Sequence, residues 1–294
     1  MFEVSIIIPC KNEVNNLKKT VDSIMNSKNK LSYEIIIVND GSTDGSCDFI
    51  NIDKEIYSSI KLISALNLGA ASSRNFGAKT ACGKYLFFCD AHVSVPDYWL
   101  DTLIKTLEDN NAHIIAPVIK DMVKEDYKGY GQTWNNNLEV MWLLNKTENN
   151  GSEIPIACGC AFGIKKEVFD AIGGFDKHFE VWGKEDEELC FKSWLFGYKI
   201  VLDISVEVKH LFRSKHPYQV THENVIYNFL CMAYSHFGNK NLVKALNIAR
   251  NNHAFSYSAA KTMINEGLMK QRKEYFSKRK YDENYFFKKF NIPF

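Results

Sequence analysis

The sequence predicts an α/β fold in which a mostly parallel sheet is flanked by helices. Short apolar runs alternate with segments of helical periodicity, which is typical of strand–helix–strand units. With 294 residues, of which 46% are hydrophobic, the chain can form one large domain or two small ones with a sizeable core. The 36 Lys and Arg nearly balance the 35 Asp and Glu, so the net charge of +1 gives no reason to expect a nucleic acid partner.

Four short apolar runs in the first third of the chain predict buried strands, with helical spacing between them. The expected strands are residues 4–8, 34–38, 60–65 and 85–89. One expected helix begins near Leu17, and a second covers residues 72–81. Ligands of such sheets bind beyond the carboxyl ends of the strands. Two of these ends carry reactive polar residues, because Asp40 follows the second strand and Asp90-Ala91-His92 follows the fourth.

The alternation continues less regularly after the fourth strand. Residues 120–155 are polar and contain Gly129, Gly131 and three consecutive asparagines, so we expect a functional loop or lid with some helix. The other expected elements are helices at 99–107, 165–172 and 185–196, an apolar segment at 157–164, and strands at 113–118 and 200–208, the last ending at His210.

The end of the chain differs from the rest in charge. Residues 239–294 contain 12 Lys or Arg and 4 Asp or Glu, a local charge of +8, with Phe and Tyr interleaved. We expect a helical extension that packs its aromatic side chains on the main domain. The alternatives are a docking surface for an acidic or phosphorylated partner and a peripheral contact with a membrane.

The eight cysteines form no C-x-x-C pair, and Cys158-x-Cys160 has the wrong spacing for a zinc knuckle or a redox motif. We therefore expect reduced thiols, as in a cytoplasmic protein. The first residues lack the basic region and the long apolar core of a signal peptide. No apolar stretch approaches the length needed to span a bilayer. The expected location is the cytoplasm, with the periphery of the membrane as the alternative.

Asp90 and His92 place a carboxylate and an imidazole at one strand end. This pair suits a first-row divalent ion such as Mn²⁺, with Mg²⁺ as the alternative, and leaves coordination positions open for phosphate oxygens. His210 ends a later strand and is a candidate third ligand. Taken singly, each histidine is explained more simply as a satisfied surface or core residue.

Two further stretches contain carboxylates that can bind or react. Asp40 can accept a hydrogen bond from a nucleobase, although its Asp-Gly-Ser-Thr-Asp sequence is also a common turn. In WGKEDEE (residues 182–188), four acids begin a helix, where the helix dipole favours them. The alternative to this capping role is that one carboxylate enters the cleft as a general base. The Trp-Gly turn before it would then form an apolar floor for a sugar ring.

The order and spacing of four motifs resemble those of the GT-A glycosyltransferases of family 2. The motifs are SIIIPCKNE (5–13), EIIIVNDGSTD (34–44), NLGAASSRNFG (67–77) and the strand that ends in Asp90-Ala91-His92. The resemblance implies a Rossmann-like nucleotide-binding sheet flanked by helices, with a helical C-terminal extension. We divide the chain accordingly into a GT-A domain (1–214), with a nucleotide-binding half (1–93) and an acceptor half (94–214), and a basic, aromatic extension (215–294).

Two groups of GT-A enzymes share further motifs with the chain. Asp90-Ala91-His92 and HLFR (210–213) resemble the polypeptide N-acetylgalactosaminyltransferases, which retain the anomeric configuration. The block from GGFD (173–176) to WGKED (182–186) resembles the β-1,4-galactosyltransferases and the bacterial chondroitin polymerases, which invert it. The two implications conflict at Asp186, which is the base of the inverting enzymes and an Asn in the retaining family. We expect inversion, because a single displacement needs a base.

The resemblance also implies a role for each site residue in binding a UDP-sugar. Asp90, His92 and His210 would hold Mn²⁺. For the nucleotide, the resemblance implies that Asp40 binds uracil, that Glu13 and the backbone near Pro9 contact the uridine, and that Arg74 contacts the pyrophosphate or the base. For the sugar and the acceptor, it implies donor contacts at Ala91 and an apolar floor at Trp182. Glu185 would bind hydroxyl groups beside the base Asp186.

The resulting hypothesis is a metal-dependent transferase that moves a hexose or N-acetylhexosamine from a UDP-sugar to a glycan, lipid-linked or peptide acceptor with inversion. The nearest alternative is a retaining or inverting enzyme that glycosylates Ser, Thr or Cys of a peptide. A nucleotidyltransferase is disfavoured, because residues 9–13 lack a Gly-rich loop. A non-catalytic sugar-nucleotide-binding protein is disfavoured because the metal set and Asp186 are intact.

Overall fold

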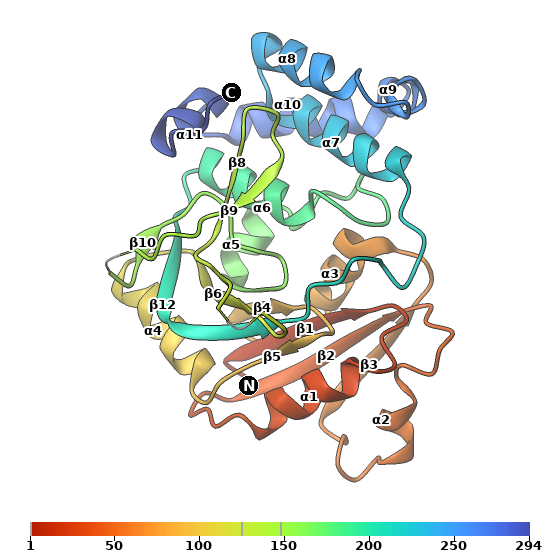
Figure 1. Ribbon diagram of the computed structural model, residues 1–294, viewed down its shortest axis with the longest axis vertical. Coiled ribbons are helices and arrows are strands. Elements are labelled where there is room, and N and C mark those ends of the chain that lie inside the picture. Colours follow the sequence, from red (N-terminus) through yellow and green to blue (C-terminus); the bar gives the residue numbers. More distant parts are fainter. Residues whose placement is uncertain (1, 125, 148) are drawn as a thin grey trace.

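A mixed sheet with helices on both faces forms the centre of the computed structural model, which describes residues 2–124, 126–147 and 149–294 (Figure 1). In spatial order the strands are β10 (Ser152–Glu153), β12 (Ile200–His210), β6 (Ile114–Asp121), β11 (Ala161–Lys165), β4 (Tyr85–Cys89), β1 (Val4–Cys10), β2 (Tyr33–Asp40) and β3 (Ile60–Ala65). Two short strands lie off this path: β5 (Val93–Ser94) pairs with β12, and β7 (Lys128–Gly129) pairs with β6.

One antiparallel strand, β11, divides two parallel parts of the sheet. β1 runs parallel to β2 and β4, and β6 runs parallel to β12, whereas β11 is antiparallel to both β4 and β6. The predicted α/β class is thus confirmed, with four parallel strands in the N-terminal half. The reversal at β11 brings the start of that strand beside the end of β4. As a result, the backbone N–H of Asp90 donates to the carbonyl of Cys160 at 2.9 Å.

The side chains of β1 alternate between two cores, as the two-residue period of a strand requires. Ile6 and Ile8 pack on one face with α1 (Leu17–Asn26) and α4 (Trp99–Asp109). Ile7 points to the other face and joins a core with α3 (Gly69–Lys79), α5 (Lys166–Ala171) and α6 (Glu185–Leu195). Each buried isoleucine contributes about 1.5–3 kcal/mol through burial of its apolar surface. The short helix α2 (Asp48–Ile52) completes the N-terminal half.

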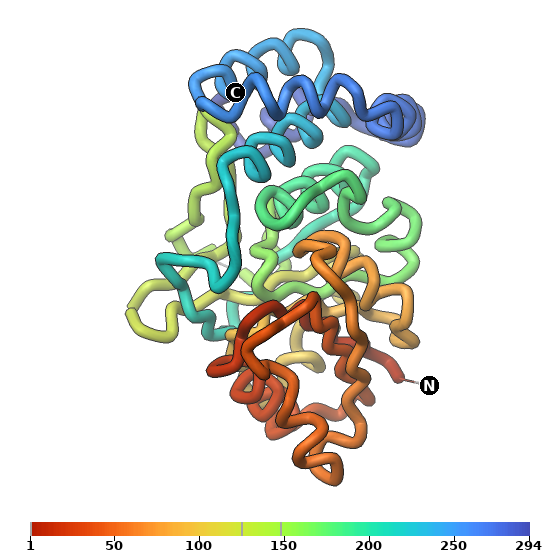
Figure 2. Tube along the Cα trace, turned by 90° about the vertical axis from the view of Figure 1, so that its right-hand side faces the viewer, coloured from red at the N-terminus to blue at the C-terminus, as the bar shows by residue number. Residues whose placement is uncertain are grey.

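The C-terminal helices stack on α6, on the side away from β1–β3 (Figures 1 and 2). They are α7 (His222–His236), α8 (Asn239–Ala249), α9 (Phe255–Met263), α10 (Glu266–Lys278) and α11 (Glu283–Lys289). Aromatic rings join them to α6: Phe191 lies 4.9 Å from Phe286, and Trp194 lies 5.0 Å from Phe290, between ring centroids. The expectation of a helical extension that packs its aromatic residues on the main domain is therefore confirmed.

Residues 120–155 contain strands where the sequence analysis expected some helix. Within the described residues, this segment contains β7, β10 and a hairpin formed by β8 (Gln132–Trp134) and β9 (Val140–Trp142). The prediction of some helix in this segment is therefore wrong. Gly129 explains part of the arrangement, since the ring of Trp142 lies where a Cβ would project. The hairpin reaches the C-terminal helices, where Trp134 packs 5.7 Å from Phe286 (Figure 2).

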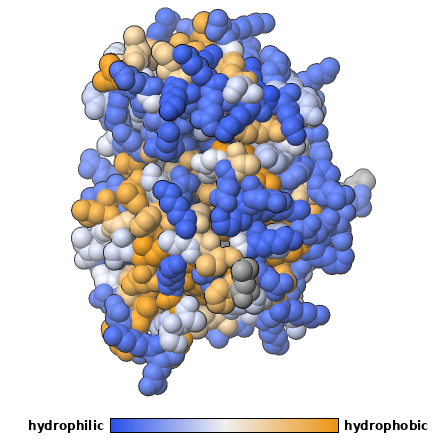
Figure 3. All heavy atoms as spheres, turned by 180° about the vertical axis from the view of Figure 1, so that it is seen from behind, coloured by the Kyte–Doolittle hydropathy of each residue, from blue (hydrophilic) through white to orange (hydrophobic). Residues whose placement is uncertain are grey.

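The C-terminal helices present a mostly hydrophilic surface, seen at the top of the molecule in Figure 3. Isolated apolar side chains are exposed near the end of α9, where Met263 is 84% exposed and Ile264 is 81% exposed. Within residues 2–124, 126–147 and 149–294, no helix combines the length and hydropathy that crossing a membrane requires.

Candidate active site

A cleft of about 640 Å³ opens beyond the carboxyl ends of β1, β2 and β4. The predicted site residues lie on this cleft with one exception, Glu13, which sits behind it. The predicted residues that do line the cleft are Pro9, Asp40, Arg74, Asp90, Ala91, His92, Trp182, Glu185, Asp186 and His210. The folded chain thus brings residues from six separate sequence motifs to one place.

Asp90, His92 and His210 form a cluster that can hold a metal ion. One ligand atom from each lies within 4.8 Å of the others, and Asp90 Oδ2 is 3.5 Å from His210 Nε2. The pairing of His210 with Val93 places β12 beside the turn that carries the other two. His210 is buried, and its Nδ1 has no hydrogen-bond partner among the described residues. One carboxylate and two imidazoles fit a first-row divalent ion.

The charge state of Asp90 also fits such an ion. Burial would raise the pKa of Asp90, but a hydrogen bond from His210 and the positive charge of Arg74 more than offset burial and hold the pKa below its usual value. The carboxylate is therefore ionised at neutral pH, as a metal ligand must be.

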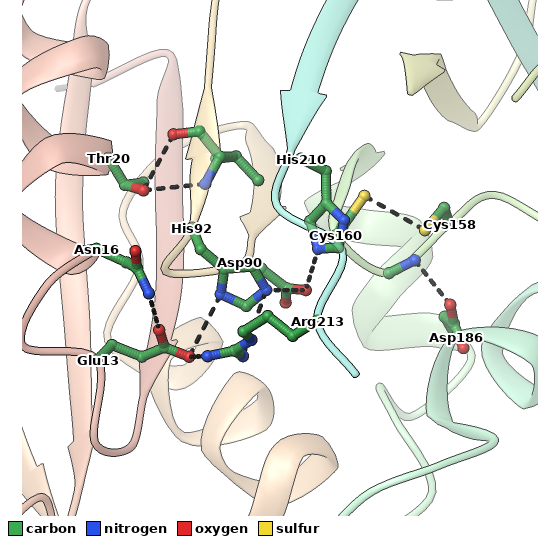
Figure 4. Close-up of polar contacts among 12 residues, drawn as sticks. Glu13, Asn16, Thr20, Asp90, His92, Cys158, Cys160, Asp186, His210 and Arg213 are labelled. Atoms are coloured by element: carbon green, nitrogen blue, oxygen red, sulfur yellow. Dashed lines mark hydrogen bonds and ion pairs between the residues drawn. The ribbon is translucent and has the colours of Figure 1, made fainter. Parts of the chain in front are cut away.

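Glu13 orients His92 from behind the cleft (Figure 4). Its Oε1 lies 3.3 Å from Nδ1 of His92 and 2.7 Å from Nη1 of Arg213, and Asn16 donates to its Oε2 at 2.9 Å. A carboxylate on the far nitrogen fixes the ring and tautomer of a metal-binding histidine. The predicted contact of Glu13 with uridine stays a prediction, since the carboxylate itself faces His92.

Arg74 links three parts of the cleft. It is buried in α3, donates from Nη2 to Asp90 Oδ1 at 2.8 Å and from Nη1 to Glu185 Oε1 at 3.2 Å. Its Nη2 also lies 3.3 Å from the carbonyl of Gly159. The guanidinium therefore holds a carboxylate from the metal cluster and one from α6 in a fixed relation. Its predicted contact with pyrophosphate or base stays a prediction.

Asp40 anchors the helix that carries Arg74. Its two carboxylate oxygens accept from the backbone N–H groups of Leu68 at 2.6 Å and Gly69 at 2.9 Å, at the start of α3. A Cβ on Gly69 would lie 2.7 Å from the nitrogen of Val181, so only glycine fits this approach. Further lone pairs of Asp40 remain for a nucleobase donor, and its predicted uracil contact stays a prediction.

The first turn of α6 brings Glu185 and Asp186 into the cleft. Glu185 Oε2 accepts from the N–H of Gly183 at 2.8 Å, and Asp186 Oδ2 accepts from the N–H of Gly159 at 2.7 Å. Burial raises the pKa of Asp186 to about 7, and the charges of Glu185 and Glu187 add to the effect. A carboxylate that titrates near neutral pH is suited to general base catalysis.

Sequence reasoning missed the segment that follows His210. His216 and Tyr218 line the cleft, and the ring of His216 lies 4.4 Å from that of Trp182, which is 40% exposed. Lys11 lies over the ring of Tyr218 at 5.8 Å. The basic and aromatic composition of SKHPYQ (214–219), directly after the HLFR motif, was an available signal.

The family model described as glycosyl transferase family 2 matches residues 5–173, more than half of the chain. The chain belongs to glycosyltransferase family 2. A second model, described as the N-terminal domain of galactosyltransferase, matches residues 146–217. That range of the family 2 chain contains α6 and His210.

Curated relatives of this family 2 protein include polypeptide N-acetylgalactosaminyltransferases. The chain is 32% identical over 242 residues to polypeptide N-acetylgalactosaminyltransferase 4 of Caenorhabditis elegans. This alignment covers 74% of the chain and 40% of the relative. The chain is 31% identical over 237 residues to polypeptide N-acetylgalactosaminyltransferase 14 of Homo sapiens, and this alignment covers 73% of the chain and 41% of the relative. The chain therefore spans about two fifths of the length of these relatives.

Solved structures confirm the GT-A fold. The crystal structure of GalNAc-T7 with UDP, GalNAc and Mn²⁺ superposes with a TM-score of 0.76 at 18% identity, covering 99% of this chain and 57% of that one. The structure of Staphylococcus aureus TarS 1–349 in complex with UDP-GlcNAc superposes with a TM-score of 0.60 at 15% identity. The superposition covers 93% of this chain and 79% of the TarS chain. At these identities, the similarity shows the fold alone and does not identify the substrates.

Proposed function

We propose that this protein transfers a hexose or N-acetylhexosamine from a UDP-sugar to a side chain of a peptide, in a reaction that depends on a divalent ion. The observation that carries the proposal is the meeting, in one cleft, of the cluster Asp90, His92 and His210 with the carboxylate of Asp186. The UDP complexes among the structural neighbours support the donor. The polypeptide transferases among the relatives support the acceptor.

Asp90, His92 and His210 would hold the ion, whose charge neutralises the diphosphate as it leaves. Mn²⁺ is our choice over Mg²⁺, because Mg²⁺ is bound through oxygen ligands whereas two of the three ligands here are imidazoles, and because the GalNAc-T7 structure contains Mn²⁺. The chain's own contribution is orientation. Glu13 fixes the ring of His92 and Arg74 fixes the carboxylate of Asp90, so neither ligand has to reorganise when the donor binds.

Asp186 is the proposed general base, and the reaction would invert the anomeric centre. The N–H of Gly159 fixes one carboxylate oxygen, and the pKa of about 7 lets the group accept the proton of an attacking hydroxyl or thiol at neutral pH. The ring of Trp182, in the turn before α6, also lines the cleft and gives the acceptor or the sugar an apolar surface. A retaining reaction is the second candidate, favoured by the Asp-x-His motif and the retaining family it resembles.

The test is release of UDP from a panel of UDP-sugars with and without Ser-, Thr- and Cys-containing peptides. Each reaction is run with Mn²⁺, with Mg²⁺ and with EDTA. We expect one donor to release UDP in a metal-dependent reaction that the correct peptide accelerates, and the NMR coupling of the product's anomeric proton to show inversion. Absence of release with every donor, together with no binding of UDP and Mn²⁺ in calorimetry, would contradict the proposal.

A further inference from the structure

Two thiols meet at the edge of the cleft, on the turn that precedes β11 (Figure 4). The Sγ atoms of Cys158 and Cys160 are 3.3 Å apart. The turn is closed by a hydrogen bond from the N–H of Ala161 to the carbonyl of Cys158, at 3.3 Å. Cys158 is half-buried and lines the cleft, whereas Cys160 is 3% exposed. Both cysteines thus border the cleft, and Cys158 is the more exposed of the two.

The backbone of this turn holds the groups that carry the proposed chemistry. The N–H of Gly159 donates to Asp186, and the carbonyl of Gly159 accepts from Arg74. The carbonyl of Cys160 accepts from the N–H of Asp90. A Cβ at Gly159 would stand 3.0 Å from the Asp186 side chain, so the missing side chain is what lets this peptide approach the carboxylate. Any change in the turn therefore reaches both the base and the metal cluster.

We propose that Cys158 and Cys160 are a modification site, which closes to a disulfide by exchange with a small-molecule disulfide and thereby draws the Gly159 peptide away from Asp186. A disulfide needs its two sulfur atoms about 2.05 Å apart, so the pair has to approach by about 1.2 Å. Gly159 is the one residue between the two cysteines, so the side-chain torsions of the cysteines and the turn around Gly159 share this movement. The loss of the Gly159–Asp186 hydrogen bond follows from that movement, and it lowers the rate of transfer.

The exchange proceeds in two balanced steps. The thiolate of Cys158 attacks one sulfur of the small disulfide RSSR, which forms a mixed disulfide and releases one RS⁻. Cys160 then gives up its proton, and its sulfur attacks Cys158 Sγ and expels the second RS⁻. The two protons lost by the cysteines end on the two released thiols, so two protein thiols are oxidised and one RSSR is reduced to two RSH. Reduced glutathione or dithiothreitol reverses the sequence.

The experiment maps the oxidation and measures its effect in parallel. The full chain is equilibrated in defined ratios of reduced to oxidised glutathione, the remaining thiols are alkylated, and peptides are analysed by mass spectrometry. We expect the peptide containing both cysteines to lose two hydrogen atoms. UDP release should fall roughly 10- to 100-fold over the same range of ratios, the change that goes with losing one charge-assisted hydrogen bond. Dithiothreitol should restore it.

Variants separate this pair from the other thiols, each compared with its own fully reduced form. Cys158→Ser and Cys160→Ser should lose the redox response, whereas Cys82→Ser, which removes the exposed thiol, should keep it. The thiols of Cys10 and Cys47 are also in hydrogen-bond contact, in the interior. A disulfide that maps to this second pair instead, or a Cys158–Cys160 disulfide that leaves the rate unchanged, would overturn the inference. The effect on rate rests on the proposed function. If the reduced protein releases no UDP from any donor, that function fails, while the peptide map still decides whether the disulfide forms.

Discussion

Helix α6 contributes side chains to two clusters of charged residues, one at its first turn that opens into the cleft and one further along the helix that packs against the C-terminal helices. The cleft cluster consists of Arg74, Asp90, Glu185 and Asp186. It sets three carboxylates against one guanidinium, and all four residues line the open cleft. The cluster therefore has excess negative charge, which a proton, an acceptor hydroxyl or a bound cation can balance.

The sealed cluster consists of Asp176, Glu188, Lys192 and His236, none of which is more than 1% exposed. Lys192 Nζ donates to Glu188 Oε2 at 3.1 Å and to the carbonyl of Gly174 at 2.7 Å. Nε2 of His236 lies 2.7 Å from the other oxygen of Glu188. Here each charge has a partner inside the protein, and the cluster fastens α6 to the helices behind it.

The comparison shows that a shifted pKa alone does not identify a catalytic group. Burial raises the pKa of Asp186 to about 7, and it raises the pKa of Asp176 to about 7 as well. The two carboxylates differ in what they face, since Asp186 faces the cleft and Asp176 accepts from Gln271 at 2.7 Å in the interior. Access to a ligand, added to the shifted pKa, is what makes Asp186 the candidate base.

The largest effect is expected for Asp186→Asn in the cleft cluster. Loss of the base should slow transfer by up to about 10⁴-fold, while binding of UDP with Mn²⁺ stays unchanged, because no metal ligand is removed. The wild-type rate should rise with pH through about 7 as Asp186 loses its proton. Initial rates and calorimetry measure the two quantities, and Asp176→Asn is the matched control. Substantial residual transfer by Asp186→Asn would favour the retaining mechanism.

Lys192→Met tests the sealed cluster in the same way. It leaves the carboxylate of Glu188 buried with one partner fewer, and should lower the free energy of unfolding by about 3–5 kcal/mol. Adding Glu188→Gln should restore part of that loss, because the unpaired charge is gone. Urea unfolding measures both variants. Lys166→Met, which breaks an exposed pair with Asp170 at the same i,i+4 spacing, should cost less than about 0.5 kcal/mol.

His210→Ala tests whether the cleft cluster extends to a metal ion. Removing one of three ligands should weaken binding of UDP in the presence of Mn²⁺ by roughly 100-fold, and should leave the weak binding measured in EDTA unchanged. Calorimetry of UDP with and without Mn²⁺ gives both values. The control is His253→Ala, at an exposed histidine in the turn between α8 and α9. Equal losses in Mn²⁺ and in EDTA would remove His210 from the metal site.

The sequence predicted the cleft cluster better than the sealed one, for a physical reason. Asp90 and His92 follow an apolar run, and the carboxyl ends of parallel strands meet at one edge of a sheet, so their place could be read locally. The partnership of Arg74 with Glu185 joins residues 111 apart in the chain, and no local pattern encodes it. Only the resemblance to a known family brought both residues to one site.

The sealed cluster had no such signal. Lys192 follows Glu188 by four residues, a spacing that normally predicts an exposed helical pair. Its complete burial depends on α7 and α10 closing over α6, which the sequence described only as a basic, aromatic extension. The strands in residues 120–155 escaped prediction similarly, because polar residues pair there as a hairpin whose Trp134 reaches the C-terminal helices.

The pH dependence of stability should also differ between the two clusters, through Asp176. Its raised pKa means that the folded protein keeps this proton up to about pH 7, whereas the unfolded chain loses it near pH 4. Its contribution to the free energy of unfolding is therefore fully present below pH 4 and is lost as the pH rises toward 7. Asp176→Asn should remove this slope, up to about 1.4 kcal/mol per pH unit in that window.

Urea unfolding at several pH values measures the slope, with the exposed Asp170→Asn as the control that should keep it. An unchanged slope in Asp176→Asn would mean that the carboxylate is ionised in the folded state and belongs with Glu188 as a partner of Lys192. The same titration on Asp186→Asn sharpens the comparison. The pKa of Asp186 is also raised to about 7, so it should contribute to the slope of stability in the same pH window, but it alone should control the slope of the rate.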